Sequence, residues 1–204
     1  QIKGWWEQFG TLVTGAAVAA ALASVGWQGW QWYQGKQTAE ASALYAVLQK
    51  AASEKNTQKS REAAGALIEK YNGTAYADMA ALLSAKVQAD AGDLKNARVP
   101  LAWAATKAND PALRELARLR LATVLFDDKA YDEALAQLQA PTDESLVARF
   151  ADLKGDILLA QGKREEAKAA YKTVVADLEK ATKGESAALR EIAQAKLDAV
   201  GGAQ

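Results

Sequence analysis

The apolar and polar residues of this chain follow two different patterns. Between Gln8 and Gly35 no residue is charged, and the centre of this stretch is rich in alanine. From Thr38 onward, alanines and leucines recur at helical spacing among charged residues, and turn sequences such as "YNGT", "AGD", "NDP" and "QGK" interrupt them at short intervals. The pattern predicts an all-α protein with an N-terminal anchor over residues 1–36 and nine further helices, without a sheet, over residues 37–204.

The first region has the dimensions of a membrane span. Trp6 and Trp27 are 21 residues apart, which corresponds to about 32 Å of α-helix and matches the roughly 30 Å hydrocarbon core of a bilayer. Amphipathic rings favour the membrane–water interface. They gather here at both ends of the stretch, as Trp5, Trp6 and Phe9 and as Trp27, Trp30, Trp32 and Tyr33. These two belts predict a single transmembrane helix over about residues 6–33.

Small residues form one face of the predicted span. Gly15, Ala19 and Ala23 fall at successive i+4 positions, and small side chains allow another transmembrane helix to approach closely. Together with Trp27 and Trp30 of the second belt, they are the residues that we expect to face the membrane and a partner helix. An alanine-rich span also produces such a face by chance. An alanine side chain removes less apolar area from water than a leucine does. An alanine-rich span therefore inserts weakly into lipid and gains from packing against a protein neighbour.

Two alternatives for the first region stay open on the sequence. The apolar centre from Thr11 to Ala23 is short, and its last three residues, "ALA", resemble the small-residue cleavage site of a removed signal peptide. The other alternative is a helix buried in a soluble core, although core packing does not require tryptophans at both ends. Lys3 and Lys36 lie on opposite sides of the stretch, so the positive-inside rule does not orient it.

The second region contains a repeat with a period near 34 residues. Small residues recur in register, and a second set precedes them by 12 positions, as expected where two antiparallel helices cross closely. The first set is Ala63, Ala97, Ala134 and Ala167, the second is Ala85, Ala122 and Gly155, and the large residues Leu101, Leu138 and Tyr171 are expected to fill the groove toward the next hairpin. The period and the segments "AYDEALAQL" and "GKREEAKAAYKTV" resemble the tetratricopeptide repeat.

This resemblance implies a tetratricopeptide-repeat-like α-solenoid of about four helical hairpins plus a C-terminal capping helix, "ESAALREIAQAKLDAV". The first hairpin, from Thr38 to Tyr71, is the most divergent. Two helix starts are also marked by their chemistry. Asp110 precedes Pro111, and Thr142 precedes a run of acidic residues, which predicts helices that begin near residues 111 and 143.

The amino-acid composition argues against several classes of function. The 25 basic and 25 acidic residues cancel and form no polybasic run, which argues against nucleic-acid binding. Cysteine and histidine are both absent, so thiol nucleophiles and the usual zinc sites are excluded. The adjacent carboxylates Asp127-Asp128 and Glu165-Glu166 fall at turns, where a solvated surface is the expected role. We therefore expect a non-enzymatic protein without a cofactor.

The inner face of such a solenoid is formed by the first helix of each hairpin. The residues expected there are mixed in character, which favours a groove for extended or partly unfolded polypeptide over a clamp for a terminal carboxylate. Some of the apolar ones also suit the core. The candidate positions for binding a partner are Met79, Leu82, Lys86, Leu119, Phe126, Arg149, Asp152 and Asp156.

The whole chain resembles the YfgM-like family of ancillary SecYEG translocon subunits. The most specific segments are "GWQGWQWYQGKQTAEASALYAVLQKA" and "VARFADLKGDILLAQGKREEAKAAYKTVV". The resemblance implies a single-pass protein of the bacterial inner membrane, with its N-terminus in the cytoplasm and its repeat domain in the periplasm. It further implies association with the SecYEG channel and with the periplasmic chaperone PpiD, and assistance to newly exported polypeptides.

Two functional hypotheses follow, beside the further possibility that the repeat domain itself binds unfolded clients as a holdase. The first is a membrane-anchored, non-enzymatic adaptor associated with the Sec translocon and a periplasmic chaperone. The alternative is a secreted or periplasmic tetratricopeptide scaffold for envelope assembly or cell division, from which the first segment is cleaved. N-terminal sequencing of the mature protein separates them, because the first requires that Trp5 to Leu22 are retained.

Overall fold

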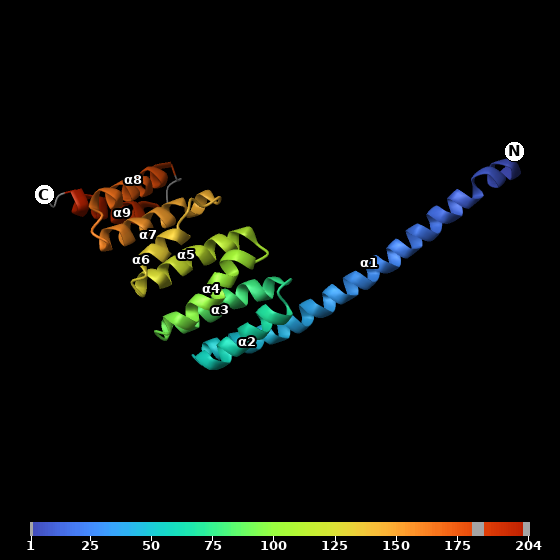
Figure 1. Ribbon diagram of the computed structural model, residues 1–204, viewed down its shortest axis with the longest axis horizontal. Helices are drawn as coiled ribbons and strands as arrows, with labels where there is room; N and C mark the ends of the chain where they lie inside the picture. Colours follow the sequence, from blue (N-terminus) through green and yellow to red (C-terminus); the bar gives the residue numbers. More distant parts are fainter. Residues whose placement is uncertain (1, 181–185, 202–204) are drawn as a thin grey trace.

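A single long helix leads into a stack of antiparallel helical hairpins in the computed structural model (Figure 1). The structure describes the backbone of residues 2–180 and 186–201, and the side chains of residues 11, 12, 14–179 and 189–201. Within these ranges there is no β-strand, as predicted. The elements in chain order are α1 (Ile2–Ser53), α2 (Thr57–Lys70), α3 (Ala75–Asp90), α4 (Leu94–Lys107), α5 (Pro111–Asp127), α6 (Tyr131–Gln137), the 3₁₀ turn η1 (Glu144–Leu146), α7 (Val147–Ala160), α8 (Arg164–Lys180) and α9 (Ser186–Gly201).

The helices stack as four hairpins followed by one capping helix. The hairpins are α1/α2, α3/α4, α5/α6 and α7/α8, and each second helix also packs against the first helix of the next hairpin. The first helices contact one another along the stack, from α1 to α3, α5 and α7, while α9 packs against α8. This is the arrangement of a tetratricopeptide-like solenoid, so the predicted four hairpins and C-terminal cap are confirmed.

The predicted anchor and the first repeat helix are one element. Helix α1 runs unbroken from Ile2 to Ser53, a length of about 78 Å at 1.5 Å per residue. The expected boundary after residue 36 therefore falls inside a helix, and the nine helices expected after it correspond to the last part of α1 together with α2–α9. Only that last part is packed, through buried residues such as Ala41 and Leu48, and the rest projects away from the stack (Figure 1).

All four hairpin turns have the same backbone geometry. One residue of each turn adopts a left-handed conformation, with φ of 53° at Lys55, 79° at Gly92, 61° at Lys129 and 77° at Gly162. The N–H of the following residue then donates to the carbonyl five residues earlier, for example from Lys163 to Leu158 at 2.9 Å. This is the Schellman motif, which ends one helix and starts the reversal of the chain. The repeat is thus present in the turns as well as in the helices.

The two predicted helix starts have different outcomes. Asp110 caps α5 as expected, because its carboxylate accepts a hydrogen bond from the Ala112 N–H at 2.8 Å while Pro111 occupies the first helical position. The start expected near residue 143 corresponds to η1, which begins at Glu144 and leads into α7 at Val147, but Thr142 is not its cap. Asp143 is the cap of η1, since it accepts from the Ser145 N–H at 2.9 Å, and the Thr142 hydroxyl is bound elsewhere, to Glu115.

Small residues lie where the helices cross, as the repeat predicts. The members of both sets are buried, and Gly155 of α7 lies directly against a side chain of α8. A Cβ at this position would lie 2.4 Å from Cε1 of Tyr171 on α8, so the phenol ring occupies the space that any side chain would need. Leu101 and Leu138 belong to the central core cluster, and Tyr171 also meets α9, because Lys196 Nζ lies 5.6 Å from its ring centroid.

Candidate functional site

The first candidate surface is the projecting part of α1. All five residues of the predicted membrane or partner face are exposed, including 63% of Trp27 and 56% of Trp30. Apart from its two chain neighbours and the backbone of its own helix, no described residue has a heavy atom within 4 Å of the position that a Cβ on Gly15 would take. Because α1 is helical throughout, the spacing of these residues places them on one side of the rod. The structure therefore brings the five together and leaves them uncovered by the chain itself.

The second aromatic belt is a compact group at the foot of this rod. The ring centroids of Trp30 and Tyr33 are 6.4 Å apart, and Lys36 Nζ lies 5.8 Å from the ring centroid of Trp32. Gln37 donates to the Tyr33 hydroxyl at 2.9 Å. The side chains of the first belt, Trp5, Trp6 and Phe9, lie outside the described residues. Among the residues that the structure does describe, no helix combines the length and the apolar character needed to cross a bilayer.

The apolar candidates on the inner face belong largely to the core. Leu82 is buried in the central cluster, and Leu119 and Phe126 are half-buried and pack against that cluster. Phe126 also contacts Tyr131, with ring centroids 5.9 Å apart. Met79 is half-buried. A partner could therefore reach only the edges of these side chains.

The basic candidates of the inner face are exposed. Lys86 forms an ion pair with Asp90 one helical turn later, and both side chains are more than half exposed. It also lines a groove of about 320 Å³ between α3 and α5, together with Arg120, Thr123 and Asp127. Arg149 is exposed at the start of α7. These polar positions, unlike the apolar ones, are open to a partner.

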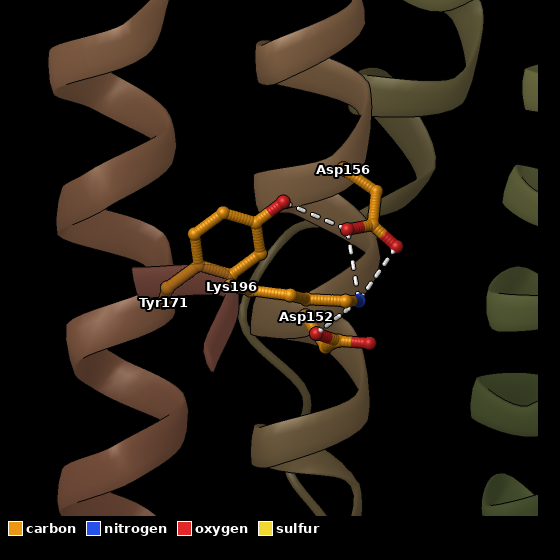
Figure 2. Close-up of polar contacts among 4 residues, drawn as sticks. All are labelled: Asp152, Asp156, Tyr171 and Lys196. Atoms are coloured by element: carbon orange, nitrogen blue, oxygen red, sulfur yellow. Dashed lines mark hydrogen bonds and ion pairs between the residues drawn. The ribbon is translucent and has the colours of Figure 1, made fainter. Parts of the chain in front are cut away.

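The acidic candidates are bound within the chain. Lys196 of α9 extends its ammonium group to both carboxylates of α7, at 2.7 Å from Asp152 and 2.9 Å from Asp156 (Figure 2). The Tyr171 hydroxyl of α8 donates to Asp156 at 2.7 Å. The three helices therefore meet in one polar cluster, and the two carboxylates join the capping helix to the last hairpin.

The pKa values of Tyr171 and Lys196 are shifted by the groups around them. Burial and the adjacent Asp156 carboxylate raise the pKa of Tyr171 far above its ordinary value. For Lys196, burial disfavours the charged form, but the hydrogen bonds and the attraction of the two carboxylates outweigh it, and the pKa is raised. The phenol stays neutral and the ammonium stays charged across the whole physiological range.

A polar contact that the sequence did not indicate joins α5 to the linker before α7. Glu115 is 7% exposed, and its Oε1 accepts from the Thr142 N–H at 2.7 Å while its Oε2 accepts from the Asp143 N–H at 3.0 Å. The hydrogen bonds from Thr142 are the main reason that the pKa of Glu115 is lowered. One turn later, Arg118 donates to the carbonyl oxygens of Gln137 and Gln139 at 2.9–3.1 Å. We call Glu115 and Arg118 with their linker partners the α5 lock.

The preceding hairpin has a simpler version of this contact. Asp78 of α3, 37 residues before Glu115, is buried and accepts from the Asn109 N–H at 2.9 Å. Both acids therefore bind the amide groups that lead into the next first helix. Their spacing equals one of the repeat intervals, and this was the signal by which a sequence search could have found the pair.

The adjacent carboxylates that the sequence singled out lie on the surface. Asp127, Asp128, Glu165 and Glu166 are exposed, and Asp128 forms an ion pair with Arg98. Across the described ranges, no group of three or more acidic side chains has an arrangement that could hold a metal ion.

Comparison with known proteins agrees with this architecture. Residues 3–202 match the family model of a tetratricopeptide repeat-like domain. The chain is 30% identical over 199 residues to an ancillary SecYEG translocon subunit of Neisseria gonorrhoeae, covering 97% of this chain and 93% of the relative. It is 33% identical over 175 residues to the protein of the same name from Haemophilus influenzae, covering 84% and 83%.

A third relative from Escherichia coli, again an ancillary SecYEG translocon subunit, is 32% identical over 104 residues, covering 51% of this chain and 50% of the relative. The similarity to the Neisseria and Haemophilus proteins extends over most of both chains and includes the repeat domain described above. On this evidence the chain belongs to the YfgM-like family of ancillary SecYEG translocon subunits with a tetratricopeptide repeat-like domain.

Proposed function

We propose that this protein is a membrane-anchored, non-enzymatic adaptor of the bacterial inner membrane. In this proposal the projecting part of α1 is a single-pass anchor, the N-terminus is cytoplasmic and the solenoid is periplasmic. The anchor contacts the SecYEG translocon and a PpiD-like chaperone, so that both are held near exported polypeptides. The names of the relatives support the translocon as a partner, and the family resemblance of the sequence supports the remaining parts.

The observation that carries the proposal is the exposed surface of the projecting part of α1. Described side chains from Thr11 to Lys36 are exposed without interruption, including apolar residues such as Leu12, Leu22 and Val25. A helix with so much uncovered apolar surface requires a lipid or protein environment. Its alanine-rich centre gains little from lipid alone, and its small residues suit close contact with another helix. Packing against a protein neighbour in the membrane would add the stabilisation that the alanine-rich centre does not gain from lipid.

The continuity of α1 gives the anchor a mechanical consequence. The aromatic belt ends at Tyr33 and the first fully buried residue of the solenoid is Ala41, a separation of about 12 Å along the helix. With no break between them, the solenoid is held close to the membrane surface and in a fixed orientation around the axis of α1. An adaptor that acts at the exit of a channel benefits from both restrictions.

Site-specific photocrosslinking tests the proposal. A photoreactive residue at Gly15, Ala19 or Trp30 of the full chain in native membranes should give adducts with a SecYEG subunit or a PpiD-like chaperone. Ala17 and Ala21 lie on the opposite side of the same helix and are also exposed, so they are matched controls that should crosslink weakly. The absence of both adducts from all three test positions would refute the proposed contact.

Topology can be tested separately because the chain contains no cysteine. In the proposed orientation, a cysteine in place of the exposed Gln49 should react in intact spheroplasts with a membrane-impermeant maleimide, whereas one in place of Lys3 should react only after lysis. The reverse labelling pattern would exclude a periplasmic solenoid. Equal labelling of both positions without lysis would exclude a span between them.

A further inference from the structure

The third hairpin lacks half of its second helix. Helix α6 has 7 residues, whereas α2 and α4 have 14 and α8 has 17. After Gln137 the chain leaves the helix and reaches α7 through residues 138–143 and η1. In the two preceding hairpins, the full-length second helix packs against the hairpin that follows. The surface of α7 and α8 that two further turns of α6 would cover therefore has no such helix over it.

An open groove lies at this place. Its volume is about 470 Å³, within the range of about 300–1,000 Å³ of sites that bind ligands. Its lining is mainly apolar and comes from the linker that follows α6, from α7 and from α8. We call it the α6–α8 groove, and its lining residues are Leu138, Ala140, Pro141, Val147, Phe150, Ala151, Lys154, Leu158, Glu166, Ala169, Ala170 and Thr173.

The wall formed by the linker is held in place by the α5 lock. Glu115 accepts hydrogen bonds from the two residues that follow Pro141, and Arg118 binds the carbonyl oxygens on both sides of Leu138. The Arg118 guanidinium carbon also lies 5.5 Å from the ring centroid of Phe150, which lines the groove. The groove is therefore organised before any partner arrives, and this lowers the entropy cost of binding.

Two charges of opposite sign stand at the groove. Lys154 and Glu166 are exposed, and neither side chain has a hydrogen bond or an ion pair with any residue in the described part of the chain. They contrast with Asp152 and Asp156 on the same helix as Lys154, which are bound by Lys196. A partner can therefore pair an acidic side chain with Lys154 and a basic one with Glu166 without displacing an internal contact.

We propose that the α6–α8 groove binds a short amphipathic α-helix of a partner protein, which takes the place of the missing turns of α6. Helix α4 provides the internal precedent, because its Ala97, Leu101 and Ala104, at i, i+4 and i+7, are buried in the stack. The bound helix directs apolar side chains at the same spacing into the groove and places a carboxylate beside Lys154. This surface is distinct from the anchor, and the proposal does not depend on the membrane function.

A designed peptide provides the probe. It has about 14 residues, with leucines at i, i+4 and i+7, glutamate on the flank that faces Lys154, and lysine on the flank that faces Glu166. Binding of the fluorescent peptide to the full chain, kept soluble in an amphipathic polymer, is followed by fluorescence anisotropy. We expect saturable binding that Ala169→Phe weakens at least tenfold, because Ala169 lines the groove and is exposed.

Ala176→Phe is the matched control, because Ala176 is exposed on the same helix and does not line the groove. It should leave the affinity unchanged. The proposal is overturned if no saturable binding is seen up to about 1 mM peptide, or if the two phenylalanine variants bind equally. It is also overturned if sedimentation shows self-association of the full chain that Ala169→Phe abolishes, since the occupant would then be a second copy.

A charge exchange tests the orientation of the bound helix. Lys154→Glu should weaken binding of the first peptide several-fold, and a second peptide with lysine in place of the facing glutamate should restore it. Non-specific adsorption to apolar surface predicts no such exchange. If the second peptide fails to restore binding, the proposed mode of recognition is wrong.

Discussion

The first and last hairpins are attached to the middle of the solenoid by different chemistry. At the N-terminal end, α1 and α2 both pack on α3, and the cluster between them consists of buried alanines and leucines, with Leu48 and Leu67 fully buried. At the C-terminal end, α6 is short, and the polar α5 lock supports the linker into α7. Phe150 and Ile157 of α7 also belong to the central apolar cluster, and Gln88 of α3 donates to the Thr57 carbonyl oxygen of α2 at 2.8 Å. The two junctions therefore differ in how much each relies on hydrogen bonds to the backbone, which are more numerous at the C-terminal one.

The difference has a consequence for function. Apolar packing stabilises the junction on which the long α1 helix depends, so the orientation of the projecting part relative to the stack is firmly held. The polar junction leaves the α6–α8 groove uncovered while fixing its wall. The end that carries the projecting part of α1 is therefore held rigidly, whereas the other end leaves an open groove between the linker, α7 and α8.

The largest effect is expected at the apolar junction. Leu48→Ala removes a fully buried side chain and should lower the free energy of unfolding by about 2–5 kcal/mol. Urea denaturation followed by circular dichroism measures it. Val47→Ala is the control at the preceding position, where the side chain is 54% exposed, and it should change stability by less than about 0.5 kcal/mol. Equal effects of the two variants would show that this junction does not depend on packing.

The polar junction should respond to both mutation and pH. Glu115→Gln leaves one linker N–H opposite an amide donor, which should cost about 1–3 kcal/mol. Because folding lowers the pKa of Glu115, the wild-type carboxylate stabilises the fold above its unfolded pKa of about 4.3, and this stabilisation is lost as the pH falls below that value. The variant should therefore lose less stability between pH 5 and pH 3 than the wild type does.

Hydrogen exchange localises this effect. Amides of α7 and α8 should exchange faster in Glu115→Gln, while those of α2 and α3 keep their protection. Glu144→Gln, in the same segment and exposed, is the control and should change neither property. Uniform acceleration along the whole chain would contradict a junction that opens independently.

The sequence predicted the parts of this fold that depend on local spacing. Ala97, Ala134 and Ala167 recur at the repeat period because each lies at a helix crossing, and Asp110-Pro111 marks a helix start through contacts within one turn. The length of α6 was predictable only in part. Pro141 in the turn sequence "APTDE" limits the helix to about residue 140, but α6 already ends at Gln137. Arg118, 19 residues before Gln137 in the chain, binds the carbonyl oxygens of Gln137 and Gln139.

The candidate site was predictable to a smaller extent for the same reason. Helical spacing places Leu82 on the first helix of its hairpin but does not distinguish a core position from an inner-face position, and the structure buries it. Asp152 and Asp156 look like free charges in the sequence because their partner, Lys196, lies 44 and 40 residues away. Exposed residues of α1 were easier to identify, since no other element contributes to that surface.

A smaller effect on stability is expected where α7 and α8, the two helices of the last hairpin, cross. Gly155→Ala places a Cβ within 2.4–2.8 Å of the Tyr171 ring, which is fully buried and tied to Asp156. Overpacking costs about 1–3 kcal/mol, and the higher helix propensity of alanine offsets about 1 kcal/mol of it, so the net loss should be about 1 kcal/mol. Gly65→Ala, with open space around it in α2, should instead stabilise by up to about 1 kcal/mol. Thermal unfolding of both variants checks the opposite signs.

The smallest effects concern the turns of the two end hairpins, which share one left-handed geometry but differ in residue. Lys55 adopts φ of 53° in the first turn and Gly162 adopts φ of 77° in the last. A side chain in this region costs about 1–2 kcal/mol, of which the greater flexibility of an unfolded glycine cancels about 0.5–1 kcal/mol. Lys55→Gly should therefore stabilise the protein by about 0.5 kcal/mol, and Gly162→Ala should destabilise it by a similar amount. Apart from the two chain neighbours of Gly162, no described residue has a heavy atom within 4 Å of a Cβ at this position, so the effect there is one of backbone conformation. Changes of the same sign in both variants would show that the two turns are not equivalent, although their hydrogen bonds match.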